Sequence, residues 1–257
     1  MPRRDKETSM GGAKGSFETT RWTQIQRAKT HDEERRQASV NNLLGRYWKP
    51  VYCYLKHKGY SNEDAKDLTQ GFFHEIVLGR ELIQQADQTK GRFRTFLLTA
   101  LDRYVTSVYR KQTAKKRLPE HGLAQLDDAK LSDMPIANLK LCPDQVFHYA
   151  WATNVLDQVF ATVKKEYYTT GRAAYWEVFQ ATVVAPILDN TEAPSLTEHC
   201  EKYGIESEKK ASNMTITVKR RFSTALKHHL RQFVDSDSEV EDELRALIEI
   251  LSKGGAA

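Results

Sequence analysis

One segment of the sequence, residues 90–117, predicts a helix with one apolar face and one basic, aromatic face. Apolar residues recur there at steps of three and four, the spacing of one side of an α-helix: Phe93, Leu97, Ala100, Tyr104 and Val108. The opposite side carries Arg92, Phe96, Thr99, Arg103 and Arg110. Cations neutralise phosphates and rings stack on unpaired bases, so this face suits a nucleic-acid strand. A solvated basic helix whose rings belong to the core fits the pattern equally well.

Helical spacing recurs along the chain, and no segment has the alternation of a strand. Pro50 should kink or divide the first helix, and Pro186 should end the helix expected at residues 172–185. Ser61 is the expected N-cap of the second helix, after Gly59 ends the first. The fold class is therefore all-α. Helices are expected at about residues 40–55, 62–78, 144–170, 172–185, 195–203, 207–233 and 237–252.

The charge of the chain is segregated, so the net charge of +5 understates its basic character. Basic blocks at 90–117 and 209–231 are separated from acids near 189–208 and 235–249, which favours a polyanionic partner. The three cysteines are too few and too far apart for a disulfide framework, and they favour a reducing cytoplasm. No apolar run approaches the roughly 18 residues of a membrane span. A cytoplasmic protein without membrane association is expected.

Motifs for catalysis are not found in the sequence. It has no glycine-rich phosphate loop, no GxSxG and no HExxH. His228 and His229 occupy adjacent positions that point to different helix faces, so surface or phosphate contact is favoured over a metal. Asp127 and Asp128 lie in a probable linker, where solvation explains them. We expect no enzyme activity, no metal and no cofactor.

Three further segments bear on binding and on domain organisation: residues 62–78, 118–143 and 195–233. Glu63, Asp67, Gln70 and His74 line the outside of the expected 62–78 helix, either as solvated surface or as a binding stripe. Residues 118–143 lose the helical spacing and contain several prolines, which is typical of a linker. Residues 195–233 have the outline of a helix-turn-helix with a turn at Gly204. Every charged residue from 209 to 231 is positive or a histidine.

Two stretches together resemble region two of bacterial RNA polymerase sigma factors. Residues 65–73, AKDLTQGFF, resemble the "AEDLvQevF" helix of that region, and residues 93–101, FRTFLLTAL, resemble the segment that follows it. Residues 47–52 and 59–61 are similar to the branch related to the extracytoplasmic-function (ECF) group. The resemblance covers about residues 17–233. It implies two small helical domains, region two (17–117) and region four (144–234), joined by a linker (118–143). The charged, Gly/Ser-rich residues 1–16 predict a disordered start, and residues 235–257 predict an acidic C-terminal helix.

The resemblance implies partners and site residues. Core RNA polymerase would bind the stripe Glu63, Asp67, Gln70 and His74, with Asp67 and Gln70 matching the family positions. The minus-ten element of promoter DNA would contact Arg92, Arg94, Phe96, Arg103, Tyr104, Arg110 and Lys111. Phe96 replaces the usual tryptophan, so the neighbouring cations are expected to carry the contact, with Phe93 and Leu97 in the core. The minus-thirty-five element would contact Lys209, Lys210, Asn213, Thr217, Lys219, Arg220 and Arg221.

Three positions depart from the family pattern. Gly71 stands where glutamate is common, and Asp102 stands where asparagine is common, which puts an acid among the cations. The turn at 204–211 lacks the usual small residue and valine of region four.

The function expected from the resemblance is that of a sigma factor in transcription initiation. The alternative is a helix-turn-helix regulator that binds DNA without docking on polymerase. An anti-sigma partner, and masking of the basic helix-turn-helix by the acidic C-terminal helix, are left open.

Overall fold

The computed structural model describes residues 33–78, 92–114, 141–189, 191–192, 195–232, 234 and 236–255. Every regular element in these ranges is helical, which confirms the all-α class. The expected disordered start and residues 118–140 of the expected linker lie outside the described residues. The elements are α2 (Glu33–His57), α3 (Asn62–Gly71), η1 (Phe72–Leu78), α5 (Phe93–Ala114), α6 (Pro143–Thr169), α7 (Ala173–Phe179), η5 (Gln180–Val184), α8 (Ala185–Asp189), α9 (Leu196–Tyr203), α10 (Glu208–Arg231) and α11 (Asp237–Gly255).

Helix α2 continues through Pro50, so of the two expected outcomes, a kink or a division, the division is wrong. Proline has no backbone N–H, which leaves the carbonyl of Arg46 without its usual partner four residues later. The side-chain amide of Asn154 on α6 donates to that carbonyl, with 3.1 Å between Nδ2 and O. A helix 108 residues away in sequence therefore supplies the hydrogen bond that Pro50 removes.

Pro186 likewise does not end its helix, contrary to expectation. The helix passes through the π-helical turn η5, in which the N–H of Ala185 donates to the carbonyl of Gln180. Pro186 is then the second residue of α8. Pro186 has no N–H to continue this series of hydrogen bonds, and the helix nevertheless runs on to Asp189.

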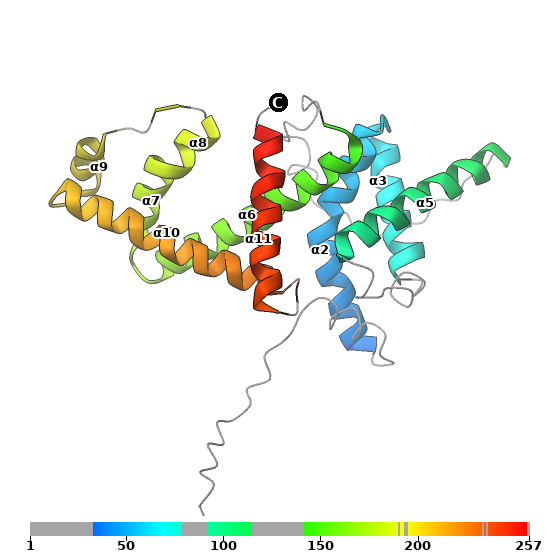
Figure 1. Ribbon diagram of the computed structural model, residues 1–257, viewed down its shortest axis with the longest axis horizontal. Coiled ribbons are helices and arrows are strands. Elements are labelled where there is room, and N and C mark those ends of the chain that lie inside the picture. The colour runs from blue at the N-terminus through cyan, green and yellow to red at the C-terminus, as the bar shows by residue number, and fades with distance from the viewer. Residues whose placement is uncertain are drawn as a thin grey trace, which may run out of the picture.

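Helix α6 crosses the middle of the molecule and joins its two halves (Figure 1). Its first half packs on α2, where the rings of Tyr47 and Phe147 stack with centroids 6.4 Å apart. Its second half lies against α7 and α10. Buried side chains from Leu43 to Leu247 form one continuous cluster across both halves. The division into a 17–117 domain and a 144–234 domain stays a prediction.

The helix-turn-helix outline is confirmed as a local structure. Ser195 and Ser207 accept the backbone N–H groups that open α9 and α10, and Gly204 takes a left-handed conformation (φ 61°) in the turn. A small second cluster of buried residues, Val178, Ala211 and Met214, lies beneath it. Leu196, Cys200 and Ile205 pack against this cluster.

Gly71 has a packing role that explains one departure from the family pattern. A Cβ atom at this position would overlap the hydroxyl of Tyr104 and would lie 3.5 Å from its Cζ. Tyr104 is buried on α5, and its ring centroid is 5.7 Å from that of Phe72. Burial raises the pKa of Tyr104 to about 12, so the hydroxyl stays neutral. Gly71 thus lets α5 approach the end of α3.

We expect Gly71→Ala to destabilise the protein by about 1–3 kcal/mol, because the new methyl group overlaps the Tyr104 hydroxyl. In a Tyr104→Phe background the cost should shrink, since the hydroxyl is gone and the Cζ contact is ordinary. Urea unfolding of the four proteins in the double-mutant cycle measures this coupling. Gly45→Ala is the control, since a Cβ there meets nothing within 4 Å and should stabilise α2. An equal cost in both backgrounds would contradict this account.

Candidate nucleic-acid interface

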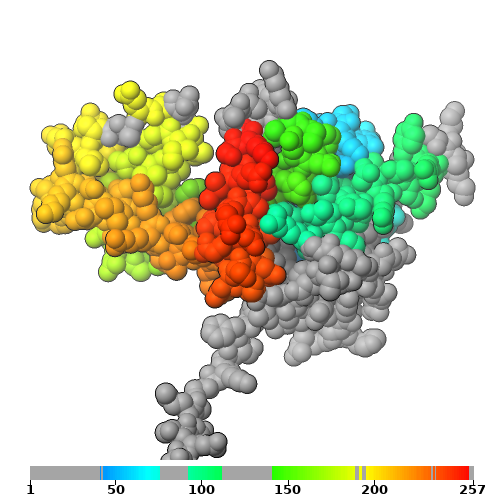
Figure 2. All heavy atoms as spheres, viewed as in Figure 1, coloured from blue at the N-terminus to red at the C-terminus, as the bar shows by residue number. Residues whose placement is uncertain are grey.

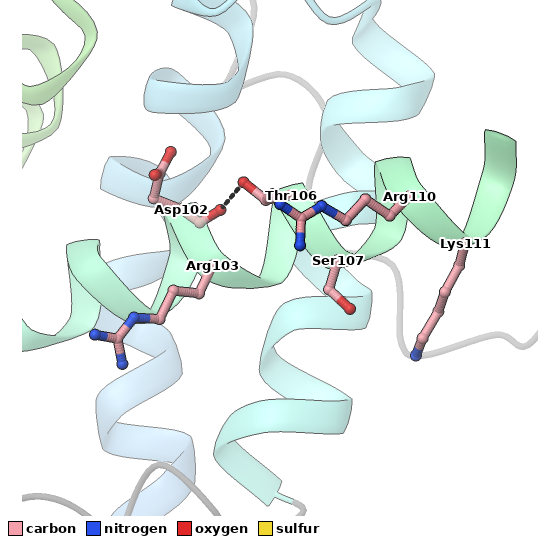
Figure 3. Close-up of a pocket in the computed structure, with 6 residues that line it drawn as sticks. All are labelled: Asp102, Arg103, Thr106, Ser107, Arg110 and Lys111. Atoms are coloured by element: carbon pink, nitrogen blue, oxygen red, sulfur yellow. Dashed lines mark hydrogen bonds between the residues drawn. The ribbon is translucent and has the colours of Figure 1, made fainter. Parts of the chain in front are cut away.

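The exposed side of α5 forms a shallow depression with a cationic lining. Its lining residues come from consecutive turns of the helix: Asp102, Arg103, Thr106, Ser107, Arg110 and Lys111. Figure 3 shows Arg103, Ser107 and Lys111 leaving the helix on one side and Asp102 on the other. Thr106 Oγ1 donates to the backbone carbonyl of Asp102 at 2.8 Å, and the neighbouring Ser107 is exposed beside the cations. The sequence predicted Arg103, Arg110 and Lys111 for this face.

Asp102 is the acid that the sequence placed among the cations, and Lys58, the residue that follows helix α2, neutralises it. Lys58 Nζ lies 2.6 Å from Asp102 Oδ1, and the Tyr54 hydroxyl donates to the same oxygen at 3.0 Å. The Lys58 hydrogen bond holds the pKa of Asp102 below its ordinary value, and that of Tyr54 acts in the same direction. The carboxylate is therefore turned toward α2, and its charge is compensated there.

Tyr109 is a candidate that the sequence analysis did not select. Its side chain is 63% exposed, the most exposed aromatic residue among those described. It follows Thr106 by three residues and Asp102 by seven, so it shares their side of the helix. That spacing, with a cation on its C-terminal side at Arg110, was a signal in the sequence. An exposed ring beside cations can stack on a base.

Arg94 and Tyr104, both expected to contact DNA, are buried in this structure. Tyr104 faces Gly71 and the aromatic core, because it lies on the apolar stripe of the helix. Arg94 is 5% exposed, and its guanidinium lies 4.3 Å from the centre of the Trp151 ring. It donates to Glu243 of α11. Neither side chain can reach DNA from these positions.

Two other residues of the expected minus-ten surface, Arg92 and Phe96, are only partly accessible to a DNA strand. Arg92 is exposed, but its Nε lies 2.8 Å from Oε1 of the same Glu243. Phe96 is half-buried and packs against the core, with its ring 6.2 Å from that of Phe93. Phe93 and Leu97 are buried, as expected.

On α10 the expected residues divide into an open face and a paired one. Lys209, Asn213, Thr217 and Arg220 follow one another at steps of three and four and are exposed. Lys219 is exposed on a neighbouring side, and Lys210 is exposed with Glu206 at 2.9 Å. Arg221 differs, because its Nε donates to both carboxylate oxygens of Glu166 at 2.9 Å. This hydrogen bond lowers the pKa of Glu166 and keeps Arg221 against α6.

The polar stripe on α3 and η1 lies at the surface. Glu63, Asp67 and His74 are exposed and Gln70 is half-buried. Ala65 and Thr69, on the other side of the same helix, are buried. Ser61 caps the helix as expected, with 3.1 Å between the Asp64 backbone N and Ser61 Oγ. The stripe is thus an accessible row of side chains on a well-anchored helix.

Within the ranges that the structure describes, no three His, Cys, Asp or Glu side chains gather as a metal site would require. No helix in those ranges is long and apolar enough to cross a membrane. Searches of protein-family models, of curated proteins and of solved structures found no match to this chain. The resemblance of residues 65–73 and 93–101 to sigma region two therefore remains a prediction.

Removing the ammonium group with Lys58→Met should raise the pKa of Asp102 toward its ordinary value of 3.8. A lowered carboxyl pKa stabilises the folded state above the unfolded pKa, and this contribution is lost as pH falls through the folded pKa. The variant should therefore lose less stability in acid than the wild type through this group. A carboxyl NMR titration measures the shift directly. Lys56→Met, where Nζ instead lies 3.3 Å from the carbonyl of Tyr60, should leave the Asp102 titration unchanged.

Proposed function

We propose that this chain is a sigma factor, which binds core RNA polymerase in the cytoplasm and brings it to promoter DNA. The observation that carries the proposal is the exposed row Arg103, Arg110 and Lys111 on α5, with its one acid neutralised from behind by Lys58. In this proposal, residues 17–117 act as region two and residues 144–234 as region four. The sequence resemblance of residues 65–73 and 93–101 supports the same assignment.

On α5, the three cations would neutralise phosphates of the minus-ten strand, and Tyr109 would stack on an unpaired base. The depression also holds the exposed hydroxyl of Ser107, which can donate to a phosphate oxygen. Packing of the helix against α2 and η1 fixes the spacing of these groups. A strand would therefore meet a preformed surface.

On α10, the exposed row Lys209, Asn213, Thr217 and Arg220 would enter the major groove of duplex DNA. Asparagine and arginine make paired hydrogen bonds to base edges, and lysine contacts phosphates. A helix that follows a tight turn and carries such a row is the usual reading element of a helix-turn-helix. This half of the molecule would recognise the minus-thirty-five element.

The row Glu63, Asp67, Gln70 and His74 would bind polymerase. The buried side of α3 anchors it, so the row can present acids and an amide at fixed spacing to a basic partner.

The alternative function is a helix-turn-helix regulator that does not dock on polymerase. The burial of Arg94 and the pairing of Arg92 favour this alternative, because they leave the α10 row more open than the start of α5. Polymerase binding distinguishes the two functions.

Arg103→Gln with Arg110→Gln should weaken binding to a forked promoter-like DNA and flatten its salt dependence. Each lost phosphate contact reduces the slope of log K against log salt by roughly 0.7 to 0.9, so two contacts reduce it by about 1.4 to 1.8. Fluorescence anisotropy at several salt concentrations measures the slope. Lys164→Gln with Lys165→Gln removes equal charge from exposed positions on α6 and is the control. An unchanged slope in the α5 variant would remove α5 from the DNA surface.

Asp67→Ala with Gln70→Ala should abolish or strongly reduce a complex with bacterial core polymerase while leaving the melting temperature unchanged, since neither side chain is buried. Co-elution on size exclusion and promoter-dependent transcripts are the readouts. Asp157→Ala with Gln158→Ala makes the same chemical change on α6 and should leave the complex intact. DNA binding by a wild-type chain that never forms a polymerase complex would favour the regulator instead.

A further inference from the structure

Helix α11 lies between the two basic elements of the molecule. It packs on α6 and α10, and Figure 2 shows it between α10 and the start of α5. Two of its apolar side chains, Val240 and Leu247, are buried. The third large buried side chain of this helix is an acid, Glu243, which is only 3% exposed.

Glu243 forms ion pairs with two cations of the expected minus-ten surface, Arg92 and Arg94. Its Oε1 lies 2.8 Å from Arg92 Nε, and its Oε2 accepts from Arg94 Nη1. Trp151 closes the other side of the Arg94 guanidinium. A carboxylate with two guanidinium groups occupies the place that a phosphate would take between the same donors.

The same helix also binds cations of α10. Glu241 Oε1 lies 2.5 Å from Lys227 Nζ, and Asp237 pairs with Arg231. Acids of α11 therefore contact both halves of the molecule at once. These ion pairs add to an apolar stripe that packs on the core and holds the helix in place: Val240, Leu244, Leu247, Ile250 and Leu251.

We propose that α11 is an autoinhibitory strap that competes with a nucleic-acid strand for Arg92 and Arg94, which rests on the proposed function of α5. With α11 seated, the guanidinium of Arg94 is covered and the exposed part of α5 binds a strand weakly. When α11 leaves, Arg92 extends the cationic row of α5 toward its N-terminus, and the Arg94 guanidinium loses its carboxylate cover. Strand binding and α11 docking then exclude each other at Glu243.

The size of the effect follows from the fraction of open molecules. If α11 is seated in about nine of ten molecules, the apparent affinity for the strand is about tenfold below that of the open form. Weakening the Glu243 contact should recover part of this factor.

The test compares wild type, Glu243→Gln and Asp242→Asn for binding to a 20-nucleotide single-stranded DNA, using the full chain. Both substitutions remove one negative charge from adjacent positions of α11. Asp242 is paired locally, with Oδ1 3.0 Å from Arg245 Nη2, whereas Arg92 and Arg94 pair with Glu243. Glu243→Gln should bind about threefold to tenfold more tightly than Asp242→Asn.

Hydrogen exchange on the wild-type chain is the second measurement, because it needs no substitution in the buried ion pair of Glu243. Amides of residues 237–255 should exchange at least threefold faster when the DNA is saturating. Equal affinities of the two variants, or unchanged exchange in α11 with DNA bound, would overturn the strap while the proposed function stands. Failure of all three proteins to bind DNA would overturn the proposed function, and the strap with it.

Discussion

The packing of α6 along α2 is the contact on which the rest of the structure depends. Asn154 restores the hydrogen bond that Pro50 takes from α2, and the Tyr47 ring stacks on Phe147. The same Tyr47 ring lies 5.7 Å from that of Phe93, so the face of α2 that receives α6 also positions the start of α5. The cationic row on α5 thus depends on α6, which begins at Pro143, 50 residues after the first residue of α5.

Charges behind the candidate surface matter as much as those on it. Lys58, just after α2, compensates Asp102, Glu166 holds Arg221 against α6, and Glu243 holds Arg94 inside the molecule. An acid in a basic segment therefore need not weaken its surface, and a cation in such a segment need not belong to it. The outcome depends on which helix lies behind each residue.

Local signals predicted the helices well, because caps and periodicity act over a few residues. Ser61, Ser195 and Gly204 end or begin helices where the sequence indicated. The errors at Pro50 and Arg94 have a common cause: the partners that decide them are 108 and 149 residues away. Helical spacing carries no information about a neighbour of that kind. The cationic row on α5 could be predicted from the sequence, whereas the packing of α11 over Arg92 and Arg94 at the N-terminal end of α5 could not.

Helix α6 also sets a length scale for the whole molecule. It runs without interruption for 27 residues, which at 1.5 Å per residue is about 40 Å. Because α2 and α5 are packed at one end and α7 and α10 at the other, the two exposed basic rows are carried on opposite ends of one rod. The two rows are therefore connected through a single uninterrupted helix, and its packing against α2 and α10 fixes how they lie relative to each other.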